Sequence, residues 1–148
     1  MSYFVLDDVS WKFYEWILKE LGESRVRISY DNGRMVFMAP LLPKHEWTKK
    51  RIARMIQMAT LQWNIPVYSL GQTTWKSRAA RKAIEPDECY YIQHEPEVRS
   101  RDKLDLRRDP PPDLVVEVEV THHPIDRLAI YAGLKINEVW LHDGEKLT

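Results

Sequence analysis

Acidic side chains gather in the stretch PPDLVVEVEVTHHP, which covers residues 111–124. Its middle part, Leu114–Val120, is rich in β-branched residues and is bounded by prolines, so it is predicted to be a strand. Side chains alternate across a strand, which puts Asp113, Glu117 and Glu119 on one face. Three acids on one face either point into water or assemble a chemical site.

A second Pro-Asp pair, Pro86-Asp87, precedes another predicted strand, ECYYI. If the two strands pair, Asp87 converges with Glu117 and Glu119. Two like charges about 4 Å apart cost roughly 4 kcal/mol at an effective dielectric constant near 20, so the cluster needs a shared proton or a divalent cation. Carboxylates with open water positions suit Mg2+ or Mn2+, which can activate water and stabilise a phosphodiester transition state.

Each acid also has a structural interpretation. Glu117 and Glu119 could be solvent-facing acids of a half-covered strand, and Pro-Asp is an ordinary turn or strand-start dipeptide. Asp87 is preferred to Asp113 as the partner of Glu117, because Asp113 lies roughly 13 Å from Glu117 along the same strand. A zinc site is not supported, because the histidines and Cys89 match no zinc-ligand spacing.

Local signals predict the elements that must position these acids. Ser10 can cap a helix that runs to about Leu21, and Asn32-Gly33 predicts a hairpin between two alternating runs. The other predicted elements are a helix at about 45–62, a short strand at 65–71, an exposed loop at 94–112, a helix at about 124–132 and a final strand at 136–143. The order α-β-β-α-β-β-β-α-β predicts an α/β fold, an α+β sandwich with a mixed central sheet flanked by helices.

The bulk composition sets limits on the function. The 148 residues are expected to form one domain, and 22 basic residues balance 22 acidic residues, so any anion-binding surface must be local. Cys89 is the only cysteine, which excludes an intrachain disulfide. Neither a signal peptide nor a membrane-spanning run is visible, so a cytoplasmic, soluble protein with no membrane partner is expected.

Basic residues are densest in the stretch WKSRAARK, where they lead directly towards Asp87. Lys76, Arg78, Arg81 and Lys82 are therefore the predicted contacts to a DNA backbone. The alternative is that they form an ordinary solvated face, which the zero net charge also allows. On the second helix, the predicted apolar stripe contains Trp47, Ile52, Met55, Ile56 and Ala59.

Three longer segments, MAPLLPKHEW, EPDECYYI and PPDLVVEVEVTHHPIDRLAIYAGLKINEVWLHDG, together resemble the Uma-type restriction endonuclease family of the PD-(D/E)XK nuclease superfamily. The resemblance covers nearly the whole chain and implies a restriction-endonuclease-like core and a Mg2+- or Mn2+-dependent nuclease. It implies that Asp87 and Glu117 are metal-binding acids, with Glu119 as a further ligand. His45 and Glu46 match the polar pair at the start of the second helix, where they would orient water or a second metal.

The sequence departs from the superfamily pattern at two points. Glu119 occupies the position expected for a catalytic lysine, and Arg127 is the nearest substitute. Arginine can grip a phosphate but stays protonated, so it is a poor proton shuttle. The chain ends at EKLT, where relatives usually continue with further strands, so a shortened product is considered. The alternatives to a nuclease are an inactive nucleic-acid-binding module and a homodimer formed through exposed aromatic residues.

Overall fold

The computed structural model describes residues 3–24, 26–39, 43–118 and 123–148. In chain order the elements are β1 (Tyr3–Leu6), α1 (Trp11–Leu21), β2 (Arg27–Asp31), β3 (Arg34–Met38), α2 (Pro43–Gln62), β4 (Tyr68–Leu70), β5 (Trp75–Ser77), β6 (Lys82–Ile84), β7 (Glu88–Tyr91), α3 (Glu95–Val98), β8 (Leu114–Val118), α4 (Arg127–Gly133) and β9 (Val139–His142). These strands and helices confirm the predicted α+β class and are consistent with a restriction-endonuclease-like fold.

The described strands form two sheets, where one mixed sheet was predicted. The first sheet has the order β1-β3-β2-β6-β5 and is antiparallel throughout. The second has the order β4-β7-β8-β9, and only its β8–β9 pair is parallel. This second sheet carries both predicted acidic strands, β7 and β8, as direct neighbours.

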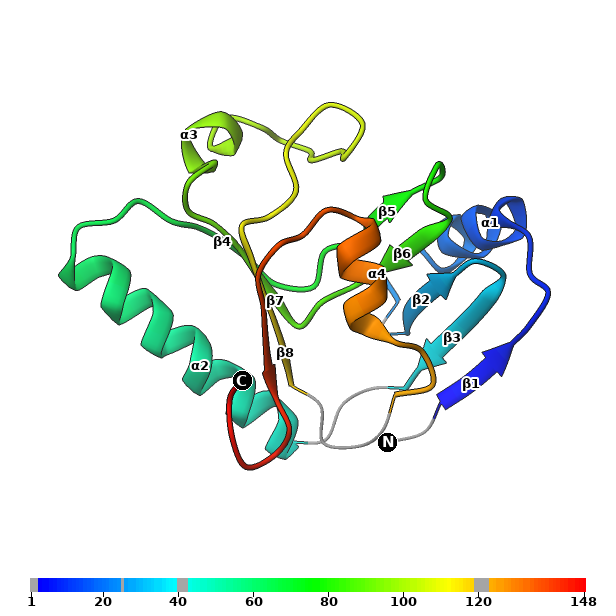
Figure 1. Cartoon of the computed structure of the whole chain (residues 1–148), viewed down its shortest axis with the longest axis horizontal. Coiled ribbons are helices and arrows are strands. Elements are labelled where there is room, and N and C mark those ends of the chain that lie inside the picture. The colour runs from blue at the N-terminus through cyan, green and yellow to red at the C-terminus, as the bar shows by residue number, and fades with distance from the viewer. Residues whose placement is uncertain (1–2, 25, 40–42, 119–122) are drawn as a thin grey trace.

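Three apolar clusters hold the layers together. The largest lies between the two sheets and contains Val36, Trp75, Val115 and Tyr131 among its buried residues. A second cluster packs α1 on the first sheet, and a third packs Ile52 and Ile56 of α2 on β8. The layers therefore run from α1 through the first sheet, α4 and the second sheet to α2, as Figure 1 shows.

Two local signals in the sequence formed as predicted. The Ser10 side chain accepts a hydrogen bond of 3.1 Å from the Phe13 amide and so caps α1. Asn32 and Gly33 both have positive φ angles, of 45° and 103°, which suit the tight turn between β2 and β3. Both signals depend only on neighbouring residues, which explains why the sequence was sufficient.

Other elements differ from the sequence prediction. The basic stretch after Trp75 is the β5–β6 hairpin, β1 was not predicted, and the supposedly exposed loop at 94–112 contains α3 with a fully buried Val98. Trp47 and Met55 are 60% and 65% exposed, so two members of the predicted α2 stripe do not face the core. None of the helices in the described ranges is long and apolar enough to cross a membrane.

Candidate active site

The two predicted acids of β7 and β8 face one another. The strands pair antiparallel with Glu88 opposite Val116, so Asp87, one residue before β7, lies opposite Glu117. The Val118 amide donates a hydrogen bond of 2.7 Å to Asp87 Oδ2, which ties the start of one strand to the end of the other. Asp87 and Glu117 are 0% and 1% exposed. The predicted pairing of the acidic strands is confirmed.

Asp87 is surrounded by cationic and polar donors. Arg27 Nη1 donates to Asp87 Oδ1 over 2.7 Å, and His45 Nε2 lies 3.3 Å from Asp87 Oδ2. Burial alone would raise the pKa of Asp87, but the hydrogen bond from His45, the charge of Arg27 and the Val118 amide outweigh it and lower the pKa. Asp87 is therefore ionised at neutral pH and is held against a buried arginine.

Glu117 has a different set of partners, both from α4. Arg127 Nη1 donates to Glu117 Oε2, and the Tyr131 hydroxyl donates to Glu117 Oε1. These donors are four residues apart, so they lie on the same face of the helix, whose first turn is capped by Asp126. Burial raises the pKa of Glu117 to about 7, and the nearby Arg127 opposes this rise.

The donor chemistry of this centre fits a divalent cation only in part. Two buried carboxylates supply the hard oxygen ligands that Mg2+ and Mn2+ prefer. In the present arrangement every oxygen of Asp87 and Glu117 accepts a contact from a protein donor. Among the described residues, no three His, Cys, Asp or Glu side chains are arranged to hold a metal. The predicted third ligand, Glu119, lies outside those residues. A cation would therefore use a remaining lone pair of these oxygens or displace one of the present contacts.

A cavity of about 350 Å3 gives access to the Glu117 side of the centre. It is lined by Glu117, Arg127 and Tyr131, together with residues 123–126, Leu128, Val139 and Leu141. The Arg127 side chain is only 9% exposed but borders this cavity, whereas the 6% exposed Arg27 side chain lies on the Asp87 side and does not line it. A phosphate group that entered the cavity would meet Arg127 and Glu117 first.

The comparison with protein families decides what kind of protein carries this centre. A family model described as Uma2, putative restriction endonuclease, matches residues 12–148, nearly the whole chain. The chain belongs to the Uma2 family. A search of curated proteins found no match. Family membership supports a nuclease and a DNA substrate as the general activity.

Of the two residues predicted at the start of α2 in this Uma2 protein, only His45 reaches the carboxylates. His45 is 2% exposed, and its Nδ1 has no hydrogen-bond partner within the described ranges. Glu46 has a 40% exposed side chain and pairs with Lys49 at 3.2 Å. Its position fits the structural interpretation, in which an acid in the first turn is favoured by the helix dipole.

Asp113, the alternative to Asp87, has a separate role at the other end of β8. Its Oδ2 accepts hydrogen bonds from the backbone amides of Ile92 at 2.6 Å and His94 at 3.0 Å. Its Oδ1 lies 2.6 Å from His94 Nδ1. These contacts fix the turn after β7, so the choice of Asp87 over Asp113 agrees with the geometry.

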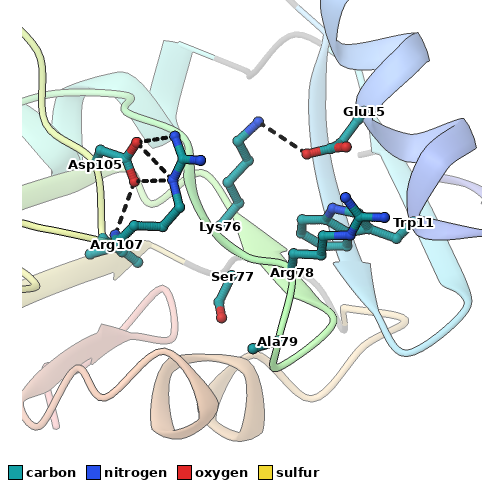
Figure 2. Close-up of a pocket in the computed structure, with 9 residues that line it drawn as sticks. Trp11, Glu15, Lys76, Ser77, Arg78, Ala79, Asp105 and Arg107 are labelled. Carbon is teal, nitrogen blue, oxygen red and sulfur yellow. Dashed lines mark hydrogen bonds and ion pairs between the residues drawn. The ribbon is translucent and has the colours of Figure 1, made fainter.

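The four predicted DNA-binding residues do not form one surface patch. Lys76 and Arg78 line a pocket beside α1, which Figure 2 shows. Arg81 donates a 3.3 Å hydrogen bond to the Tyr30 hydroxyl, and the partly buried Lys82 pairs with Asp31. The β5–β6 hairpin explains the split, because its turn points neighbouring basic residues in different directions.

Sequence reasoning missed two members of the Uma2 centre, Arg27 and Tyr131. Arg27 lies in one of the two alternating runs around Asn32-Gly33, and nothing local indicates that its partner is 60 residues away. Tyr131 could have been found, because it follows Arg127 by four residues on a predicted helix. Arg127 itself pairs with Glu117, while the neighbouring Asp126 accepts from the Ala129 amide.

Proposed function

We propose that this Uma2 protein is a metal-dependent endonuclease that hydrolyses phosphodiester bonds in DNA. The observation that carries the proposal is the register of β7 and β8, which sets the buried Asp87 opposite the buried Glu117. In the proposal these two carboxylates, with Glu119, hold Mg2+ or Mn2+. The bound ion would supply activation of water and stabilisation of charge on the phosphate.

The remaining residues of the centre bind and orient. Arg127 grips the scissile phosphate, because its planar guanidinium matches phosphate geometry and it borders the cavity next to Glu117. His45 holds Asp87 in place and orients water, while Arg27 stabilises the charge of Asp87 from the side away from the cavity. Glu46 stays predicted to orient water or a second metal. Lys76, Arg78, Arg81 and Lys82 stay predicted contacts to the DNA backbone.

Cleavage of supercoiled plasmid tests this proposal directly. The protein is incubated with plasmid and Mg2+, Mn2+ or EDTA, and the Glu117→Gln variant is compared with Glu20→Gln, a matched change at an exposed position on α1. Metal-dependent nicking should fall at least ~100-fold in Glu117→Gln, which corresponds to about 2.7 kcal/mol, and should persist in Glu20→Gln. Nicking that survives EDTA, or that is equal in both variants, would refute the assignment.

A second candidate function is favoured by the two arginine contacts. Arg27 and Arg127 already neutralise the carboxylates, and Arg127, the nearest substitute for the missing lysine, cannot exchange a proton during turnover. In this alternative the protein binds nucleic acid without cleaving it. Titration with Mn2+ separates the two candidates, because only a metal-dependent nuclease should show saturable binding that Asp87→Asn removes.

The predicted homodimer also stays a prediction, and the outer face of α2 supports it. Four large apolar side chains there, Trp47, Met55, Met58 and Leu61, are 60–82% exposed. Such a stripe is more apolar than a solvated helix face usually is. Gel filtration at two protein concentrations tests it, with a shift to later elution on dilution as the expected result.

A further inference from the structure

A pocket separate from the Asp87–Glu117 centre lies between α1, the turn of the β5–β6 hairpin and the loop before β8. It has a volume of about 670 Å3 and is lined by Trp11, Glu15, residues 76–79 and residues 105–107. None of these residues contacts Asp87 or Glu117 within the described ranges. Its volume is in the range of sites that bind small molecules.

Three cationic side chains from two different segments line this pocket. Arg107 is held by Asp105, which accepts from its Nε at 3.0 Å and its Nη2 at 2.6 Å, so that Nη1 keeps its donors for another group. Lys76 lies 3.8 Å from Glu15, and both side chains are more than 40% exposed, so this pair is weak. Within the described part of the chain, Arg78 has no ion-pair partner. Figure 2 shows the three cations around one opening.

The pocket lining also contains aromatic and apolar residues. Trp11 is 6% exposed, and its indole N–H is buried without an acceptor among the described residues. This nitrogen is closed to solvent, so Trp11 offers a ligand only the ring atoms that line the pocket. Leu106 and Ala79 complete the apolar lining. Aromatic walls beside cations are the combination that binds bases and phosphates together.

The charge of the pocket limits the number of phosphates. Three cations, Lys76, Arg78 and Arg107, stand against two carboxylates, Glu15 and Asp105, which leaves one net positive charge. A terminal phosphate carries about 1.5 to 2 negative charges at pH 7, so one phosphate already exceeds this net charge, and the further charges of a polyphosphate would meet the carboxylates. The composition therefore favours a single phosphate attached to a planar base.

We propose that this pocket binds one nucleotide unit, with its phosphate between Lys76, Arg78 and Arg107 and its base against Trp11 and Leu106. The unit has two sources with the same chemistry, a free nucleoside 5′-monophosphate or the 5′-phosphorylated end of a nucleic-acid strand. Binding here requires neither the metal nor the hydrolysis assigned to the Asp87–Glu117 centre. The pocket shares Lys76 and Arg78 with the predicted contacts to the DNA backbone, but it shares no residue with the catalytic centre.

Isothermal titration of the full chain in EDTA tests the proposal. The ligands are the four nucleoside 5′-monophosphates, a nucleoside, inorganic phosphate, a nucleoside triphosphate, and a trinucleotide with and without a 5′-phosphate. At least one monophosphate should bind ten or more times more tightly than the nucleoside, inorganic phosphate and triphosphate. Tighter binding of the phosphorylated trinucleotide assigns the site to strand ends, and its failure to bind assigns the site to free nucleotides.

Substitutions at exposed positions of the pocket show whether the nucleotide binds there. Arg78→Ala and Lys76→Ala should each weaken binding of the monophosphate at least tenfold, because each removes one charged donor. Lys146→Ala, an exposed change near the end of the chain, is the matched control and should leave binding unchanged. Equal weakening in all three variants, binding of inorganic phosphate as tight as the nucleotide, or no binding at all would overturn the proposal. Nucleotide binding without plasmid cleavage would refute only the nuclease, and cleavage without nucleotide binding would refute only this pocket.

Discussion

Replacing Asp87 by asparagine should destabilise the protein strongly, because Arg27 would lose the carboxylate with which it pairs. The Arg27 side chain is 6% exposed and also donates to the Glu85 carbonyl, so it is fixed in place and cannot turn to water. Asp87 Oδ1 accepts from Arg27, and Asp87 Oδ2 accepts from the backbone N–H of Val118. Asparagine keeps one acceptor oxygen and puts an NH2 group in the place of the other. At least one buried donor is then left without a partner.

The size of the effect follows from this burial. Removing one partner of a buried ion pair costs about 3–5 kcal/mol, because an uncompensated charge stays in the interior. A chain of this length loses roughly 2–4 °C in melting temperature per kcal/mol, so the expected drop is on the order of 6–20 °C. Total stabilities of about 5–15 kcal/mol leave the variant folded in most of that range.

Chemical unfolding followed by far-UV circular dichroism measures this loss. Asp102→Asn, an exposed change in the loop before β8, is the matched control and should alter stability by less than about 0.5 kcal/mol. Arg27→Met in the wild-type and Asp87→Asn backgrounds completes a double-mutant cycle, whose coupling energy should reach about 2 kcal/mol or more. A loss below about 1 kcal/mol in Asp87→Asn would refute the reasoning, because the ion pair would then be open in solution.

Three further outcomes are expected. The pKa of Asp87 in the folded protein lies below its usual value of 3.8, so the ion pair stabilises the protein fully above pH 3.8. This stabilisation is lost as the pH falls from there through the pKa of the folded state. In thermal melts, the difference in stability between wild type and Asp87→Asn should therefore shrink from pH 6 to pH 3. Gly133→Ala would place a Cβ 2.3 Å from Lys82 Cδ, so the flexible Lys82 side chain must move and its ion pair with Asp31 is disturbed; the change should stabilise more in a Lys82→Ala background, where only helix propensity remains, and equal effects in both backgrounds by urea unfolding would contradict this. Ser10→Ala should cost about 1 kcal/mol in urea unfolding by removing the cap of α1, and no change would mean that the cap is not formed.

The sequence was sufficient wherever a signal was local or a strand pair had a strong pattern. The cap at Ser10 and the turn at Asn32-Gly33 depend on a few neighbouring residues. Pairing of β7 with β8 could be anticipated from two Pro-Asp starts, and that pairing brings Asp87 to Glu117. Strands of three residues, such as β5 and β6, carry too little pattern to be seen, which is why their hairpin was missed.

The charge balance of the site could not be predicted from the sequence. Arg27 and Asp87 are 60 residues apart, and their contact depends on how the first sheet packs beside the second. The sequence pattern describes the acids as a bare cluster that needs a cation, whereas in the structure each acid faces an arginine of the same chain. The repulsion between the two carboxylates can therefore be relieved by arginine side chains of the protein as well as by a metal ion.

Arg27 and Arg127 differ in how easily their side chains can leave the carboxylates, and this difference affects how a metal ion could bind. Arg27 is enclosed on the Asp87 side and donates to a backbone carbonyl, so its displacement would cost much of the stability of the fold. Arg127 borders the cavity beside Glu117, and a phosphate arriving there can take over its charge-assisted hydrogen bond. A metal ion that takes the place of Arg127 on Glu117 would therefore bind more tightly together with an anion that holds Arg127. We expect metal affinity in the absence of DNA to be low, and we expect Arg127→Met to raise that affinity while lowering any cleavage of DNA. If the variant binds Mn2+ no more tightly than wild type, Arg127 is not the group that limits metal binding to Glu117.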